Sequence, residues 1–166
     1  MVNLRPQGHA NAFVRVLPHL PWPPPVNGDS LTDVASRRIS SKVWVLDEIK
    51  QLVRQFSAGN DHAINIITTD CSRDLQKLCL EKADIAEFVE LLSEDHYLNS
   101  AWCMASQREG VKVREEARWY PCDAYCLEVV RQINDSESVE NKLYIKMCKT
   151  ASGKMLLIAS MHESIY

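Results

Sequence analysis

The chain has 166 residues, of which 46% are hydrophobic and 25% are charged, as in an ordinary globular protein with a core of its own. It contains no run of about eighteen apolar residues, which argues against a membrane-spanning helix and therefore against a membrane partner. Its first twenty residues lack the apolar stretch of a secretory signal. Without an export signal, the six cysteines favour reduced thiols over disulfides. These features predict a soluble, cytoplasmic protein.

The formal net charge is −3, and it is distributed unevenly. Residues 1–42 carry five basic and two acidic residues, which leaves 14 basic and 20 acidic residues in the rest of the chain. The rest of the chain thus has a net charge of −6 and repels nucleic acids as a whole. Contact with RNA or DNA would require a local basic patch.

Six of the seven prolines lie within the first 25 residues. Proline lacks a backbone donor and fixes φ, so this stretch favours an extended or polyproline II conformation over a sheet. We therefore divide the chain into a proline-rich N-terminal arm, residues 1–42, and a folded domain, residues 43–166.

The first half of the domain has helical patterns. Apolar residues recur at helical spacing from Val45 to Phe56, and Gly59 follows as a C-cap. The short β-branched stretch 62–70 predicts a strand. A second helix is expected after Ser72 as its N-cap, and a third is expected after Asp84.

The second half changes to strand patterns. Before these patterns begin, residues 93–102 are expected to form a turn or short helix. Residues 123–130 are strand-like, and 142–148 alternate between apolar and polar side chains. Residues 155–162 are nearly all apolar and predict a central strand that is covered on both sides. Helices followed by strands indicate an α+β domain with an antiparallel sheet.

Motifs for common cofactors and metals are absent. The five glycines are scattered, and no glycine-rich phosphate loop or HExxH motif occurs. Cys122 and Cys126 could join His96 or His162 around zinc, but the spacing does not support such a site. A nucleophilic role for Cys122 is disfavoured because the neighbouring Asp123 would raise its pKa. We expect neither a metal nor a cofactor.

An aromatic cluster lies in the segment "RWYPCDAY", with Arg118, Asp123 and Tyr125 among its members. Arginine and aromatic side chains together can stack on a nucleotide. The same residues can form an aromatic corner that closes the core. The residues alone favour the second interpretation.

The last two strands read as a hairpin whose register is open. With a three-residue loop, the numbers of paired residues add to 306, and Tyr144 lies opposite His162 on one face. With a two-residue loop the sum is 305, and His162 moves to the other face. The sequence does not decide between the two registers.

In the first register Tyr144, Lys146 and His162 converge on one surface. That set suits RNA cleavage without a metal: a base takes the ribose 2′-hydroxyl proton, a cation stabilises the charged phosphorane, and an acid protonates the leaving oxygen. Histidine is the natural acid or base near neutral pH. A histidine near a C-terminus is, however, more often a solvent-exposed residue than a catalytic one.

The order of these pieces resembles the MqsR family of toxin–antitoxin ribonucleases over residues 43–163. A helix ending "LVRQFSAG" is followed by "LLSEDHYLNS", by "DAY", by "LYIKM" and by "LLIASMHE". The family has "L-S-E-x-D-F-Y-K-S", "W-Q-D-V-Y", "V-Y-L-K-I" and "L-I-V-S-F-K-E" in the same order. The individual motifs are short, and their shared order and spacing carry the resemblance.

The resemblance implies a RelE-like α+β fold, with a small antiparallel sheet and helices on one side. It implies an mRNA interferase that needs no metal and is inhibited by a cognate antitoxin. Position by position, the implied catalytic residues are Tyr144, Lys146 and His162, with His162 at the family's C-terminal lysine. The implied substrate-binding residues are Tyr97, Asp123 and Tyr125, to which we add Arg118.

Two positions depart from the family. Its lysine after the first tyrosine is Leu98 here, and its glutamine before the aspartate is Cys122. Both are associated with activity in the family.

Two other functions stay open. The first is a non-catalytic inhibitor or interaction protein on the same fold, from a phage or mobile element, with an acidic surface that mimics nucleic acid. The second is a DNA-binding regulator, although no predicted helix is strongly basic. The oligomeric state, including a possible dimer, is not predicted.

Overall fold

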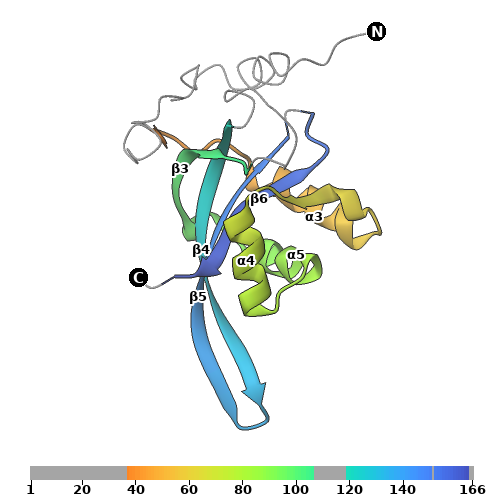
Figure 1. The fold of residues 1–166 in the computed structure, drawn as a ribbon, viewed down its shortest axis with the longest axis vertical. Helices are drawn as coiled ribbons and strands as arrows, with labels where there is room; N and C mark the ends of the chain where they lie inside the picture. The colour runs from red at the N-terminus through yellow and green to blue at the C-terminus, as the bar shows by residue number, and fades with distance from the viewer. Residues whose placement is uncertain (1–36, 107–118, 151, 165–166) are drawn as a thin grey trace.

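A six-stranded sheet runs through the protein (Figure 1), in a computed structural model that describes residues 37–106, 119–150 and 152–164. The strand order is β1-β3-β4-β5-β6-β2, and neighbours are antiparallel except β2 and β6, which are parallel. The strands are β1 (Arg38–Ile39), β2 (Ile64–Ile66), β3 (Tyr97–Met104), β4 (Trp119–Asn134), β5 (Glu137–Lys149) and β6 (Leu156–Glu163). The predicted α+β class with a mainly antiparallel sheet is confirmed.

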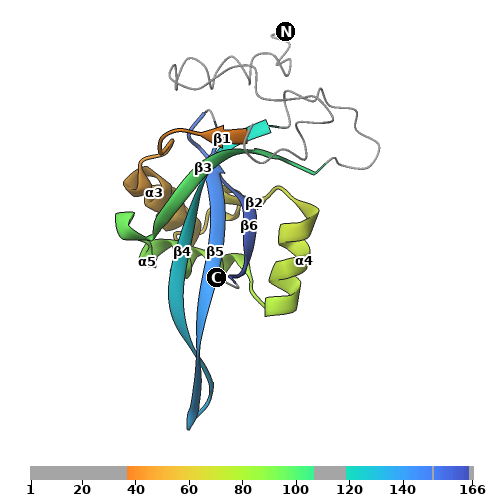
Figure 2. The same ribbon diagram turned by 90° about the vertical axis from the view of Figure 1, so that its left-hand side faces the viewer.

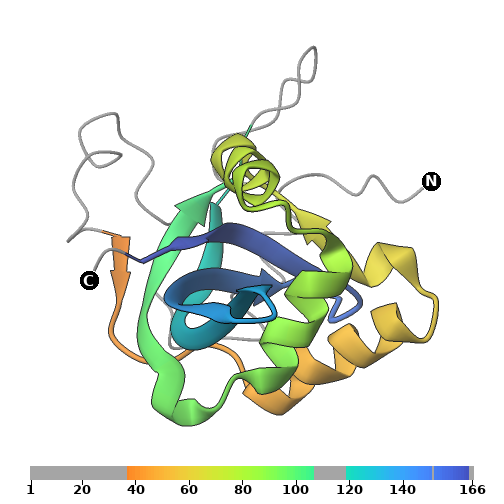
Figure 3. The same cartoon turned by 90° about the horizontal axis from the view of Figure 1, so that it is seen from below.

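The α-helices flank this sheet. They are α3 (Leu46–Ser57), α4 (Thr69–Leu78) and α5 (Lys82–Leu91), with short 3-10 helices at Asp61–Ala63 and Glu94–His96. α3 and α5 pack together, whereas α4 packs against β6, at the end of the sheet away from β3 (Figures 2 and 3). Every helix in the described residues is too short or too polar to cross a membrane.

Helix α3 follows its apolar pattern. Leu46, Ile49, Leu52 and Val53 are buried against the core. Val45, which shares the pattern, is instead 57% exposed, because it is the extended residue before the helix. Gly59 follows the helix at φ 107°, in the left-handed region that favours glycine.

The starts of α4 and α5 differ from the predictions. α4 is capped by Thr68 rather than Ser72: the Thr68 hydroxyl accepts from the Cys71 N–H and donates to the Ala159 carbonyl of β6. α5 begins after Glu81, and Asp84 is its third residue. The Asp84 carboxylate accepts from the Glu81 N–H at 2.7 Å as part of a capping box.

Two segments pair with strands that lie far away in the sequence. Of residues 93–102, Glu94–His96 form the expected short helix, but Tyr97–Met104 forms β3 and pairs with β4. Arg38 and Ile39, which we had assigned to the arm, form an edge strand against Ala101 and Ser100. Both elements depend on long-range pairing, which local patterns do not indicate.

The core lies on the face of β5 that carries Leu143, Ile145 and Met147, all of which are buried as predicted. The central strand β6 is buried on both faces from Leu156 to Ala159, also as predicted. These residues join the helices into one hydrophobic cluster.

The β5–β6 hairpin contains both of the registers considered above. Near the turn the pairs follow the sum of 305, as in Met147 with Ile158. A bulge then lies between Lys146 and Met147, and beyond it the sum is 306, so that Tyr144 pairs with His162. The extra residue of β6 thus moves His162 to the face of Tyr144.

Strands β4 and β5 continue beyond the sheet as a two-stranded ribbon (Figures 1 and 2). In the described chain, β3 pairs with β4 only as far as Tyr125, and β6 pairs with β5 only from Leu143. Residues 127–142 therefore pair mainly with each other, around a turn at Asp135 and Ser136.

Candidate functional site

The side chains of Tyr144 and His162 stack on one face of the β5–β6 pair. Their ring centroids are 5.0 Å apart and their planes differ by 21°. The Lys146 Nζ lies 5.6 Å from the centroid of the Tyr144 ring. The structure thus brings together the three residues predicted to be catalytic, and all three are half-buried.

The hydrogen bond of His162 defines its tautomer. Its Nδ1 lies 2.9 Å from the backbone carbonyl oxygen of Glu163. A carbonyl oxygen can only accept, so Nδ1 carries the hydrogen in this contact. When the ring is neutral, Nε2 is therefore the nitrogen that can take a proton from a ligand.

Lys146 keeps its positive charge despite its burial. Burial by itself lowers the pKa of the ammonium, but interactions with Cys103 and with the Tyr144 hydroxyl outweigh it, and the pKa of Lys146 is raised. Lys146 is therefore a fixed cation at neutral pH, next to the stacked rings.

A cavity of about 420 Å³ opens beside Lys146. Polar residues in its lining are Arg37, Thr68, Asp70, Ser106, Lys146 and Ser160. Same-face pairs follow each other about 6–7 Å apart along a strand, so the Lys146–Ser160 pair lies next to the Tyr144–His162 pair. The cavity is therefore adjacent to the stacked rings.

Sequence reasoning missed the other residues of this cavity. Ser160 could have been found, since the register that pairs Tyr144 with His162 also pairs Lys146 with Ser160. Arg37 and Asp70 lie far away in the sequence and carry no local signal. Arg37 brings a second cation, 5.9 Å from the Trp119 ring centroid, and Asp70 is bonded to Arg73 at 3.2 Å.

Asp123 is part of the core, which corrects its predicted role in substrate binding. It is 1% exposed and accepts hydrogen bonds from the Val43 N–H, the Trp44 N–H and the Ser100 hydroxyl, at 3.0, 2.8 and 2.5 Å. Burial raises the pKa of Asp123, against the effect of these donors. The carboxylate therefore holds the segment before α3 against the sheet.

Tyr125 also belongs to the core rather than to a substrate surface. It is 1% exposed and pairs with Ile145, on the face opposite to Tyr144. Its ring makes an edge contact with Tyr97, with centroids 5.9 Å apart. The aromatic corner is thus the interpretation that the geometry favours.

Tyr97 lies on the same face as Tyr125, away from His162. Its hydroxyl lies 2.8 Å from the Ser100 Oγ, so it extends the hydrogen-bond group around Asp123. Arg118 falls outside the described residues.

The two positions that depart from the family differ in exposure. Leu98 is 49% exposed at the start of β3, whereas Cys122 is fully buried. The Cys122 thiol contacts those of Cys103 and Cys148, and burial is the main cause of its raised pKa. Cys122 is therefore a packed thiol rather than a nucleophile.

The free cysteines in the described residues include the Cys122–Cys126 pair that we considered for zinc. The described residues contain no group of three or more His, Cys, Asp or Glu side chains arranged to hold a metal ion.

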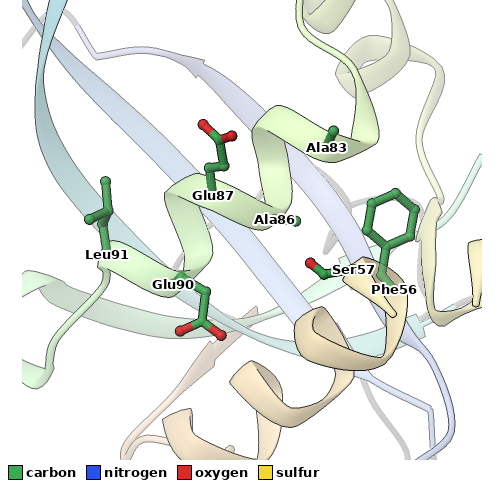
Figure 4. A pocket seen from close by; sticks show the side chains of 7 residues that line it. All are labelled: Phe56, Ser57, Ala83, Ala86, Glu87, Glu90 and Leu91. Atoms are coloured by element: carbon green, nitrogen blue, oxygen red, sulfur yellow. The ribbon is translucent and has the colours of Figure 1, made fainter. Parts of the chain in front are cut away.

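A second hollow, of about 620 Å³, lies between α3 and α5 (Figure 4). Phe56, Ala83, Ala86 and Leu91 provide its apolar lining, and its ionisable lining residues are Glu87 and Glu90. Glu90 is already bonded to Arg54 at 2.9 Å. The described residues that line this hollow offer no cation to a phosphate, unlike those of the cavity beside Lys146.

No family model, no curated protein and no solved structure matches this chain. The features that point to a function are therefore the geometry of Tyr144, Lys146 and His162 and the resemblance of the sequence to the MqsR family.

Proposed function

We propose that the protein is an endoribonuclease that cleaves single-stranded RNA by attack of a ribose 2′-hydroxyl, without a metal ion. The observation that carries this proposal is the convergence of an imidazole, a phenol and an ammonium on one sheet face. These groups can supply the proton transfers and the positive charge that the reaction needs.

His162 transfers protons in the proposed reaction. As a base, Nε2 takes the proton from the 2′-hydroxyl, whose oxygen attacks the adjacent phosphorus. As an acid, the imidazolium protonates the 5′-oxygen that leaves. The bond between Nδ1 and the Glu163 carbonyl fixes the ring for either step.

Lys146 stabilises the negative charge that develops on the phosphate oxygens. Its raised pKa keeps it protonated. Arg37 adds a second cation to the cavity beside it. Among the described lining residues the one carboxylate is that of Asp70, which forms an ion pair with Arg73. The domain as a whole is acidic, so contact with RNA requires a local basic patch, and these two cations provide one.

Tyr144 positions the substrate or takes part in proton transfer. It lies against the His162 ring and within 5.6 Å of the Lys146 Nζ, so it restricts both groups. By the resemblance, the same protein acts as an mRNA interferase toxin, and a cognate antitoxin inhibits it.

The chemistry can be tested with an oligoribonucleotide and its product ends. We expect cleavage to leave a 2′,3′-cyclic phosphate and a 5′-hydroxyl, and to stop at a nucleotide whose 2′-hydroxyl is replaced by hydrogen. Lys146→Met should lower kcat by roughly 100-fold, because it removes the cation that stabilises the phosphorane.

Lys154→Met is the matched control, because Lys154 is exposed in the β5–β6 turn. It should leave kcat within about twofold. Products with a 5′-phosphate, or equal losses in the two lysine variants, would contradict the mechanism.

The second candidate is a non-catalytic binding protein on the same fold. The observation that favours it is Cys122, a fully buried thiol at the position where the family has a glutamine associated with activity. An intact fold with no cleavage of any RNA would support it.

A further inference from the structure

In the described part of the chain the β4–β5 ribbon leaves two strand edges unpaired. The edge of β5 is the shorter one, because β6 pairs with β5 from Leu143 and the Ser164 N–H donates to the Lys142 carbonyl. β4 pairs with β3 up to Tyr125, so its outer edge is free from Cys126 onward. A bulge between Gln132 and Asn134 ends the regular part. The free edge of regular geometry therefore spans residues 127–132, a length typical of a whole strand.

Such an edge can accept another strand. A two-stranded ribbon is at best marginally stable, and its outward N–H and C=O groups are a template for another strand. The ribbon also exposes apolar surface, since Val130 is 68% exposed opposite Glu140. A hollow of about 280 Å³ lies at its base, between Glu128–Val130 and Glu140–Lys142.

The charge of the ribbon selects the kind of partner. Residues 127–142 contain four acidic residues, Glu128, Asp135, Glu137 and Glu140, and two basic residues, Arg131 and Lys142. Lys142 is already paired with Glu128 at 3.3 Å. The net negative charge disfavours RNA, and it disfavours edge-to-edge pairing with a second copy, which would bring the carboxylates together.

We propose that the ribbon binds an extended, basic segment of a partner protein, which adds as a strand to the outer edge of β4. Backbone hydrogen bonds to residues 127–132 supply affinity. The carboxylates of Glu128 and Glu140 contact lysine or arginine side chains of the segment, and Val130 contacts an apolar one. This interaction is independent of RNA cleavage.

The ribbon and the proposed active site share a face of the sheet. Cys126 pairs with Tyr144, Glu128 with Lys142, and Val130 with Glu140, so the side chains of these pairs project to one side. A strand added to the outer edge of β4 is separated from Tyr144 by β4 itself, and from His162 by β4 and β5.

The test uses the full chain and a fluorescein-labelled peptide that alternates Lys and Val, followed by fluorescence anisotropy at low ionic strength. We expect saturable binding. The double variant Glu128→Lys/Glu140→Lys should weaken it by at least about tenfold. The matched control Glu87→Lys/Asp95→Lys makes the same change in net charge at exposed positions away from the ribbon, and it should change Kd less than about twofold.

Amide hydrogen exchange gives an independent readout. Bound peptide should slow exchange at residues 127–132, whether or not the double variant folds well. The proposal is overturned by the absence of peptide binding, by equal weakening in both double variants, or by unchanged ribbon amides. Protection of the same amides by RNA, or by dimerisation of the chain alone, would also overturn it.

Discussion

The Asp123 carboxylate joins two parts of the fold, because it accepts hydrogen bonds from Val43 and Trp44 before α3 and from Ser100 on β3. Each of these donors is buried. A buried donor that loses its acceptor costs the full free energy of its desolvation. The stability of this corner therefore depends on the hydrogen-bonding groups of one side chain.

Replacing Asp123 separates hydrogen bonding from charge. Asp123→Ala should lower the free energy of unfolding by about 3 kcal/mol, since it leaves two buried N–H groups and a buried hydroxyl without an acceptor. Asp123→Asn should cost less than about 1 kcal/mol, because its oxygen can accept from the backbone while its amide donates to Ser100. Urea unfolding at neutral pH measures both, and equal losses would contradict this role.

The pH dependence gives the sign of the charge effect. Burial raises the pKa of Asp123 above its ordinary value of 3.8. The folded state then holds the proton more tightly than the unfolded chain, so this group's contribution to stability falls as the pH rises from 3.8 through the raised pKa. Asp123→Asn lacks this proton, so its stability relative to the wild type should improve over that window.

At the scale of the element, the first turn of α4 is anchored by Thr68. Its hydroxyl accepts from the Cys71 N–H at 3.1 Å and donates to the Ala159 carbonyl at 2.7 Å. Ala159 is the extra residue beside the bulge of β6. The cap thus joins the helix to the bulge of β6, and this bulge places His162 on the face of Tyr144.

Thr68→Ala should destabilise the protein by about 1–2 kcal/mol, because it removes a cap and a bond to β6. Ser72→Ala should change stability by less than about 0.5 kcal/mol, since Ser72 is exposed and bonds only to the Thr68 carbonyl of its own helix. Thermal unfolding of the two variants decides whether Thr68 or Ser72 caps α4. A larger loss in Ser72→Ala would contradict the structure.

The sequence predicted the elements whose signal is local. The apolar stripe of α3 and the alternation of Leu143, Ile145 and Met147 are read along one segment, and both are confirmed. β1 and β3 were missed because they exist only through pairing with strands far away in the chain. The cap of α4 was misplaced because β6, not the helix alone, selects Thr68.

The candidate site was predictable only in part, for the same reason. Alternation placed Tyr144 and Lys146 on one face, but the position of His162 depended on a bulge that no loop length indicates. The resemblance assigned Asp123 and Tyr125 to substrate binding, yet both are buried, as in the aromatic corner that the residues alone favoured. Arg37 reaches the cavity from a segment that we had assigned to the arm.

At the scale of the whole molecule, charge is divided between surfaces. The domain as a whole is acidic, while the cavity beside the stacked rings holds Lys146 and Arg37. The ribbon, by contrast, carries four of the acidic residues. This division suits an RNA site of limited extent next to a surface for a basic protein segment.

The most direct measurement compares RNA cleavage in EDTA by the wild type, His162→Ala and His62→Ala. His62 is an exposed histidine near α3 and serves as the matched control. The account predicts cleavage by the wild type and His62→Ala, and a loss of at least about 100-fold in His162→Ala. Unchanged cleavage in His162→Ala would remove this residue from the mechanism, and the absence of cleavage by the folded wild type would contradict the proposed nuclease.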